Sequence, residues 1–154
     1  MARRPKATAD ETNVREGFEN FTLRLPVGQS ERMTRFTTRH RLSVGELFTF
    51  GLNVANVKPD GSDRRMIDYA RLNNELSNGE GGVIAHSGRF TLTEANRIRT
   101  FRTLHNLSMP YLLVYLMNEI DIGPAGEGRL WIDFETMTII QRGTDAEVRR
   151  LRNG

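Results

Sequence analysis

Two stretches of the chain alternate apolar and polar residues, and each is followed by apolar residues at helical spacing. In the first, residues 21–25 read Phe-Thr-Leu-Arg-Leu, so every second side chain is apolar, as in a half-buried β-strand. Pro26 ends this stretch because proline has no amide to donate to a neighbouring strand. Residues 27–39 then place Met33 and Phe36 on one face of an amphipathic helix. A strand followed directly by a helix is therefore predicted.

A second helix is predicted to begin at Ser43. Glu46 stands three residues later, which is the spacing of a capping box, where each side chain binds the other residue's backbone amide. The helix ends before the turn sequence Pro-Asp-Gly at residues 59–61. Its apolar residues are Leu47, Phe48, Phe50, Leu52 and Val54.

The same order of strand, helix and helix recurs later in the chain. Residues 89–92 alternate again, Thr93 can cap a helix, and Ser108 precedes another helix. Sliding the sequence along itself so that Arg32 falls on Arg97 superposes eight identical residues between positions 32 and 53. The identical pairs are Arg32/Arg97, Phe36/Phe101, Thr38/Thr103, His40/His105, Leu42/Leu107, Ser43/Ser108, Leu47/Leu112 and Asn53/Asn118. We interpret this as an internal duplication, in which the strands align only after a further shift of a couple of residues.

The remaining residues form connecting and terminal segments. Residues 62–77 are predicted to form a connecting helix, and the glycine-rich residues 78–82 to turn the chain. Residues 130–134 and 138–141 alternate as a small β-hairpin. The predicted organisation is a flexible basic arm at 1–17, a tandem domain at 18–122 with units at 19–57 and 86–120, and a hairpin with a basic tail at 123–154.

The two predicted strands are expected to pair with each other. A lone strand leaves its backbone groups and its apolar face uncovered, whereas antiparallel pairing above four helices covers both. The expected fold class is mainly α with a short antiparallel β-ribbon, built from two strand–helix–helix units as an intramolecular pseudo-dimer, plus a small C-terminal β-hairpin. The smallest folded species would then be a monomer.

One face of this ribbon is expected to be apolar and the other polar. The apolar face would present Phe21, Leu23, Leu25, Phe90 and Leu92 to the helices. The polar face would display Asn20, Thr22, Arg24, Ser87, Arg89 and Thr91, with Thr93 as a further candidate. A two-stranded ribbon fits the major groove of duplex DNA, where arginine binds guanine and asparagine or threonine binds other base edges. The helix starts at Ser43 and Ser108 would offer free amides and a positive dipole end to phosphates.

The charge of the chain agrees with a nucleic-acid ligand. The net charge is +3, and 20 of the 22 basic residues are arginine, whose planar fork suits phosphates and guanine. A GC-rich genome would give the same arginine bias. Residues 1–50 hold nine basic and six acidic residues, so the excess lies toward the N-terminus. Arg3, Arg4 and Lys6 of the predicted arm are expected to contact phosphate.

Several other function classes are disfavoured. The absence of cysteine removes disulfides, thiolate zinc sites and thiol nucleophiles, and it fits the cytoplasmic location that we expect. No apolar run approaches the ~20 residues of a membrane span. His40 and His105 fit turn positions better than metal ligation, and His86 is a weak phosphate candidate. Asp133 and Glu135 lack a nucleophile or base beside them. We therefore expect no catalytic residue, no metal and no cofactor.

The first strand and second helix together resemble a known family. Residues 21–26 read Phe-Thr-Leu-Arg-Leu-Pro, and residues 42–46 read Leu-Ser-Val-Gly-Glu, which is similar to the Arc/MetJ ribbon-helix-helix superfamily. The resemblance implies two ribbon-helix-helix units. It also implies base readers, by which we mean side chains that bind base edges, and a phosphate clamp, by which we mean residues at a helix start that bind a DNA phosphate. The implied base readers are Asn20, Thr22 and Arg24, and the implied clamp is Ser43 and Val44.

A tandem form of this unit is similar to the TraY-type relaxosome proteins of conjugative plasmids and to the accessory proteins of T-DNA border processing. That similarity implies sequence-specific binding of double-stranded DNA, in aid of plasmid or T-DNA transfer, with a relaxase or other DNA-processing protein as a further partner. The alternatives are a transcriptional repressor and an antitoxin-type protein-binding module. Because the two strands offer different residues, the two halves of the DNA site are expected to differ.

Overall fold

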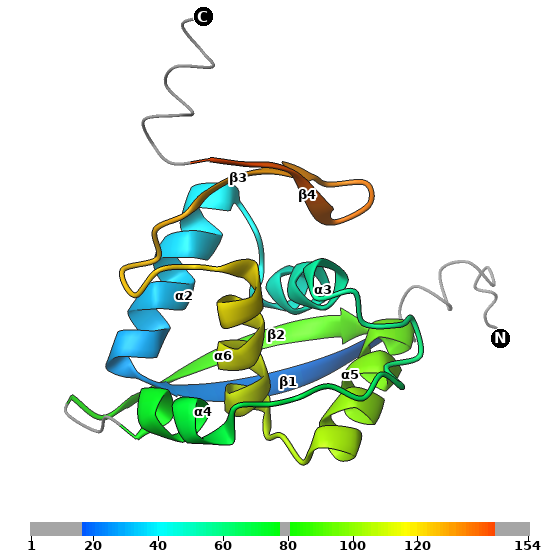
Figure 1. The fold of residues 1–154 in the computed structure, drawn as a ribbon, viewed down its shortest axis with the longest axis horizontal. Helices are drawn as coiled ribbons and strands as arrows, with labels where there is room; N and C mark the ends of the chain where they lie inside the picture. Colours follow the sequence, from blue (N-terminus) through cyan, green and yellow to red (C-terminus); the bar gives the residue numbers. More distant parts are fainter. Residues whose placement is uncertain (1–16, 78–80, 144–154) are drawn as a thin grey trace, which may run out of the picture.

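The computed structural model describes residues 17–77 and 81–143 (Figure 1). In chain order the elements are β1 (Phe18–Pro26), α2 (Val27–His40), α3 (Val44–Val54), α4 (Tyr69–Leu76), β2 (Val83–Thr91), α5 (Leu92–His105), α6 (Met109–Ile120), β3 (Arg129–Asp133) and β4 (Thr138–Gly143). Strands β1 and β2 form one two-stranded antiparallel sheet, which we call the ribbon, and β3 and β4 form another. Within these residues no helix has the length and apolar character needed to cross a membrane.

The expected fold class is wrong. The described residues are 48% helix and 23% strand, in five helices and two separate two-stranded sheets, so the protein is mixed α and β rather than mainly helical. The intramolecular pseudo-dimer of two ribbon-helix-helix units is not shown either. Helix α4 packs against α6, whereas strand β4 packs against α3. The two halves of the chain are therefore covered by different extra elements. The strand content is higher than expected because each ribbon strand has nine residues.

The inner face of the ribbon is apolar where the alternation predicted it. Leu23, Leu25 and Phe90 are buried, and the Phe21 ring stacks on the Phe90 ring at 4.3 Å between centroids. Gly88 lies opposite Phe21, and a Cβ atom at Gly88 would come within 2.6 Å of that ring. The stacked pair therefore needs a glycine in the neighbouring strand.

The second strand begins and ends earlier than predicted. It occupies Val83–Thr91, and the Thr91 side chain accepts a hydrogen bond from the Glu94 amide as the N-cap of α5. Leu92, expected in the core, is the first residue of α5 and is 43% exposed. Thr93, expected as the cap, lies inside the helix.

The offset of the repeat continues through the strands without a shift, contrary to expectation. The offset is 65 residues, the spacing of Arg32 and Arg97. Adding it to both ends of α2 gives both ends of α5, and adding it to the start of α3 gives the start of α6. Thr22 and Ser87, which the same offset relates, lie directly opposite each other in the ribbon. Phe21 and Phe90, which stack on each other, are not related by this offset and lie at different positions of their strands.

The connection between the two halves is less helical than predicted. Helix α4 is limited to Tyr69–Leu76, and Asp68 caps it by accepting the Arg71 amide at 3.0 Å. Before it, the chain is held in an irregular path, because the Arg65 amide donates to Nε2 of His105 at 2.9 Å. A tertiary contact here replaces the helical hydrogen bonds that the local sequence favours.

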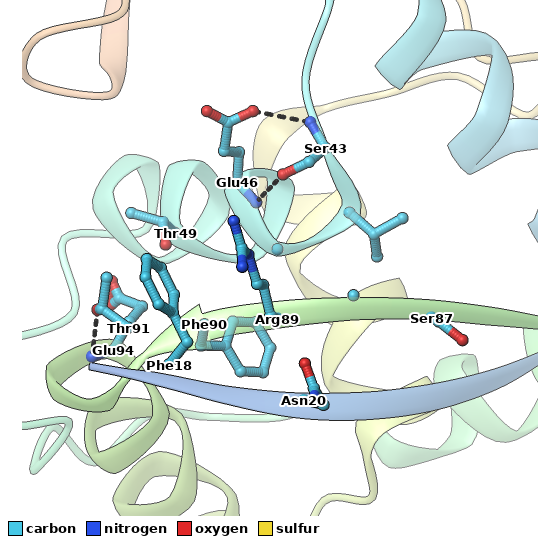
Figure 2. Close-up of a pocket in the computed structure, with 13 residues that line it drawn as sticks. Phe18, Asn20, Ser43, Glu46, Thr49, Ser87, Arg89, Phe90, Thr91 and Glu94 are labelled. Atoms are coloured by element: carbon cyan, nitrogen blue, oxygen red, sulfur yellow. Dashed lines mark hydrogen bonds between the residues drawn. The ribbon is translucent and has the colours of Figure 1, made fainter. Parts of the chain in front are cut away.

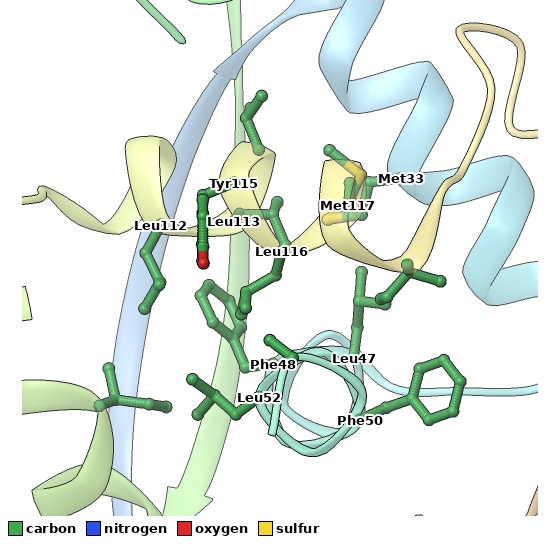
Figure 3. Packing of buried hydrophobic residues seen from close by; sticks show 14 of the residues in the cluster. Met33, Leu47, Phe48, Phe50, Leu52, Leu112, Leu113, Tyr115, Leu116 and Met117 are labelled. Carbon is green, nitrogen blue, oxygen red and sulfur yellow. The ribbon is translucent and has the colours of Figure 1, made fainter. Parts of the chain in front are cut away.

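The core lies between the ribbon and the helices. Helices α3 and α6 contact each other at its centre, and Figure 3 shows their leucines and Phe48 facing one another. The close approach requires Gly51, where a Cβ atom would be 2.8 Å from Cβ of Leu116. The β3–β4 hairpin lies beyond α3, away from the ribbon (Figure 1).

Two buried arginines tie the helices to distant backbone. Arg32 of α2 donates to the carbonyl of Ile122 at 2.6 Å. Arg97 of α5 donates to the carbonyl of Val57 at 2.6 Å. Each carbonyl follows the last turn of a helix from the other half of the chain. These hydrogen bonds join parts of the sequence that are 90 and 40 residues apart.

Candidate nucleic-acid interface

The side of the ribbon that faces away from the helices carries the predicted base readers. We call it the outer face. Every residue of this face between positions 20 and 24 and between 85 and 89 is exposed. Those residues are Asn20, Thr22, Arg24, Ala85, Ser87 and Arg89. The structure therefore brings four of the five predicted base readers together, with Thr91 at the end of the same strand.

The antiparallel register sets which of these side chains are neighbours. Asn20 lies opposite Arg89, and Thr22 lies opposite Ser87. Arg24 lies opposite Ala85. Directly opposed side chains have Cβ atoms about 4.5–5.5 Å apart. The outer face is thus a short polar surface with an arginine toward each end and two hydroxyls between them.

Phe18 adds an aromatic ring that the sequence reasoning missed. It lies two residues before Asn20 on the outer face, and the Arg89 guanidinium carbon lies 4.4 Å from the centroid of its ring. Figure 2 shows the two side chains next to each other near the first turn of α3. Cation–π contact of this kind restricts the arginine before any ligand binds. The available signal was Phe18 itself, an apolar residue at an otherwise polar position of the alternation.

Thr91 is already engaged at the end of the ribbon. Its hydroxyl oxygen accepts the Glu94 amide at 3.1 Å, and its backbone pairs with Phe18. The side chain is exposed, so it can still donate a hydrogen bond to a ligand.

The first turn of α3 reaches the β2 edge of the ribbon. The predicted capping box is confirmed, since the Glu46 amide donates to Ser43 Oγ at 3.0 Å and the Ser43 amide donates to Glu46 Oε1 at 2.8 Å. Within the described residues, the amides of Val44 and Gly45 make no hydrogen bond. Gly45 is buried whereas Val44 is half-buried, so the Val44 amide is the donor left for an anion. The Glu46 carboxylate places a negative charge beside it.

The α3 turn packs directly on the β2 backbone at Gly45. A Cβ atom on Gly45 would lie 2.2 Å from the Arg89 carbonyl oxygen, so alanine would push the helix off the strand. We expect Gly45→Ala to lower the free energy of unfolding by roughly 1–3 kcal/mol, measured by urea denaturation. Gly28→Ala is the matched control, because a Cβ atom there meets nothing within 4 Å and helix propensity favours alanine by about 1 kcal/mol. Equal destabilisation by both substitutions would contradict the close packing.

The first turn of α6 has a different character. Ser108 is its N-cap but makes no side-chain capping bond, a proline stands in the first turn, and no acidic residue is present there. Arg99 and Arg102 of α5 line a hollow with Met109 and β1. Arg102 Nε donates to the Leu107 carbonyl at 2.9 Å. Sequence reasoning missed this arginine pair because their position beside α6 depends on how α5 packs.

The Arg99 side chain also reaches the ribbon. Its guanidinium lies 2.7 Å from a carboxylate oxygen of Glu19 on β1. Both side chains are about half exposed, so solvent weakens the pair and a phosphate can compete for the arginine.

His86 and His105 have structural partners. His86 lies on the inner face opposite Leu23 and is 2.8 Å from the Ser30 hydroxyl, and burial lowers the pKa of His86 below its ordinary value. His105 lies 3.0 Å from the Phe101 carbonyl through Nδ1 and accepts the Arg65 amide through Nε2. In the described part of the chain no three His, Cys, Asp or Glu residues cluster as metal ligands.

Asp133 belongs to the turn of the β3–β4 hairpin. Its Oδ1 atom accepts the Glu135 amide at 2.9 Å and the Thr136 amide at 3.3 Å. This is a turn contact that positions the backbone. Glu135 itself is exposed.

The predicted arm residues Arg3, Arg4 and Lys6 lie outside the described residues. Comparison of the chain with family models, with curated proteins and with solved structures finds no match in any of the three.

Proposed function

We propose that this protein binds double-stranded DNA by placing the outer face of its ribbon in the major groove. The observation that carries the proposal is the outer face itself. It exposes two arginines, an asparagine and hydroxyl side chains on a two-stranded sheet whose other face buries Leu23, Leu25 and Phe90 against the helices. The major groove is about 12 Å wide and admits such a ribbon. Arg24 and Arg89 would bind guanine, and Asn20 and Thr22 would bind other base edges.

The two edges of the ribbon would contact the DNA backbone. At the β2 edge, Ser43 and Val44 of the α3 turn would meet one phosphate. At the β1 edge, Ser108 of the α6 turn would meet the other, together with Arg99 and Arg102. The first turn of α6 carries no acidic residue, whereas Glu46 stands in that of α3. Arg3, Arg4 and Lys6 would add contacts of the same kind.

For the biological process we propose an accessory role in plasmid or T-DNA processing, with a relaxase or other DNA-processing protein as partner. One feature of the hairpin supports a protein partner. Trp131, Phe134 and Ile140 are exposed there by 41%, 55% and 67%, on the side of the molecule away from the ribbon. A transcriptional repressor would use the same ribbon without such a partner.

Titration of a labelled mixed-sequence duplex with the full chain tests DNA binding. We expect binding at about 50 mM salt and weaker binding at about 200 mM, since each phosphate contact contributes about 0.9 to the slope of log affinity against log salt. No binding at the lower salt concentration would refute the proposal.

Replacing Glu46 by glutamine is expected to strengthen DNA binding about 1.5- to 5-fold, because it removes the repulsion between the carboxylate and a bound phosphate, roughly 0.2–1 kcal/mol for an exposed pair of charges. Glutamine keeps an oxygen that can accept the Ser43 amide, so the capping box persists. The matched control is Glu135→Gln, which removes the same charge from the hairpin. If both variants bind DNA equally well, the α3 turn does not contact phosphate.

A further inference from the structure

The two arginines of the outer face have a defined separation. Arg24 and Arg89 lie on opposite strands, each two residues from the central Thr22–Ser87 pair. Arg89 lies opposite Asn20, so the two arginine positions are four residues apart along β1. At about 3.4 Å per residue this is about 14 Å. Base pairs rise about 3.4 Å each, so the separation matches about four base steps.

The antiparallel pairing also fixes the relative orientation of these arginines. A half-turn about the Thr22–Ser87 pair exchanges the two strands and brings the position of Arg24 onto that of Arg89. A half-turn about an axis through the major groove likewise exchanges the two DNA strands. When these axes coincide, the two arginines face guanines on opposite DNA strands.

The surroundings of the two arginines are unequal. Arg89 has Asn20 directly opposite and the Phe18 ring beneath its guanidinium. Asparagine can make a bidentate contact with adenine. Arg24 has Ala85 opposite, whose methyl group can only make apolar contact. The Arg89–Asn20 pair therefore carries two hydrogen-bonding readers, and the Arg24–Ala85 pair carries one.

We infer that the preferred DNA site contains two guanines on opposite strands, about four base steps apart, with an adenine fixed beside the guanine of the Arg89 end and a tolerant position beside the other. This inference rests on the proposed function. It assigns the base-binding side chains to the two ends of the site according to which residues lie opposite each other across the strands. The sequence alone had suggested that each strand binds one half of the site. The unequal ends give the protein one orientation on its site.

Selection from random duplexes with the full chain tests the inference. Two substitutions at exposed positions are compared with the wild type: one removes the asparagine from the Arg89 end, and the other adds an asparagine at the Arg24 end. Wild-type protein should enrich the two guanines and the single fixed adenine. Asn20→Ala should reduce the preference for that adenine about tenfold or more and keep both guanines. Ala85→Asn should create a second adenine preference at the opposite end. Unchanged thermal unfolding of both variants verifies that the ribbon is intact.

The outcomes separate the inference from the proposed function. Enrichment of a perfect palindrome by the wild-type protein, or an adenine preference that survives Asn20→Ala, overturns the inference but leaves duplex binding in place. Equal binding of all duplexes also overturns the inference and leaves duplex binding in place. Failure to retain any duplex overturns the proposed function, and the inference falls with it.

Discussion

Replacing Arg97 by alanine is expected to lower the free energy of unfolding by about 3–5 kcal/mol, the usual cost of removing one partner from a buried ion pair. Arg97 is 7% exposed. Its guanidinium donates to the Val57 carbonyl at 2.6 Å and to Asn53 Oδ1 at 3.0 Å. It also pairs with Glu94 at 3.1 Å. Alanine leaves all three acceptors without this donor in a region that water reaches poorly.

Urea unfolding at neutral pH measures the effect. The control is Arg64→Ala, because Arg64 is exposed on the connection between the halves and such surface changes usually stay within about 0.5 kcal/mol. Arg97→Lys keeps the charge but loses the planar fork, so it should fall between the two. A loss below about 1 kcal/mol for Arg97→Ala would mean that water replaces the guanidinium.

The parts of the fold that follow from local sequence were predictable. The alternation of residues 21–25 placed Leu23 and Leu25 on the inner face, and both are buried. The start of α3 was predictable because Ser43 and Glu46 recognise each other within one turn. Signals of this kind depend only on neighbouring residues in the sequence, so they predict local structure regardless of how the rest of the chain packs.

The second ribbon strand was not predictable to the same degree. Its inner positions include His86 and Gly88, which break the apolar alternation. Both residues fit only because of distant partners. His86 meets Ser30, and Gly88 makes room for Phe21. A pattern that depends on the opposite strand cannot be read from one strand alone.

The candidate site shows the same division. The inward apolar residues determine which residues face outward, so Asn20, Thr22 and Arg24 could be assigned to the outer face before the structure. Their cross-strand neighbours could not be assigned, because the register depends on the whole connection between the strands. The repeat likewise identified Arg32 and Arg97 as equivalent, but gave no sign that both are buried.

Replacing Arg24 and Arg89 together by alanine is expected to weaken binding to the preferred DNA site by about 2–6 kcal/mol, since each bidentate arginine–guanine contact contributes about 1–3 kcal/mol of discrimination. Binding to unrelated duplex should change less. Both side chains are exposed, and only Arg89 has a ring contact to lose, so the fold should persist.

Competition between the preferred duplex and a scrambled duplex, at two salt concentrations, distinguishes base contacts from phosphate contacts. If the arginines read bases, the difference in affinity between the two duplexes collapses. If they bind phosphate instead, both duplexes weaken alike and the slope of log affinity against log salt flattens by up to about 1.8. Arg35→Ala with Arg64→Ala removes the same charge from exposed positions off the ribbon. That control should preserve the preference, because a uniform loss of positive charge cannot tell one base sequence from another.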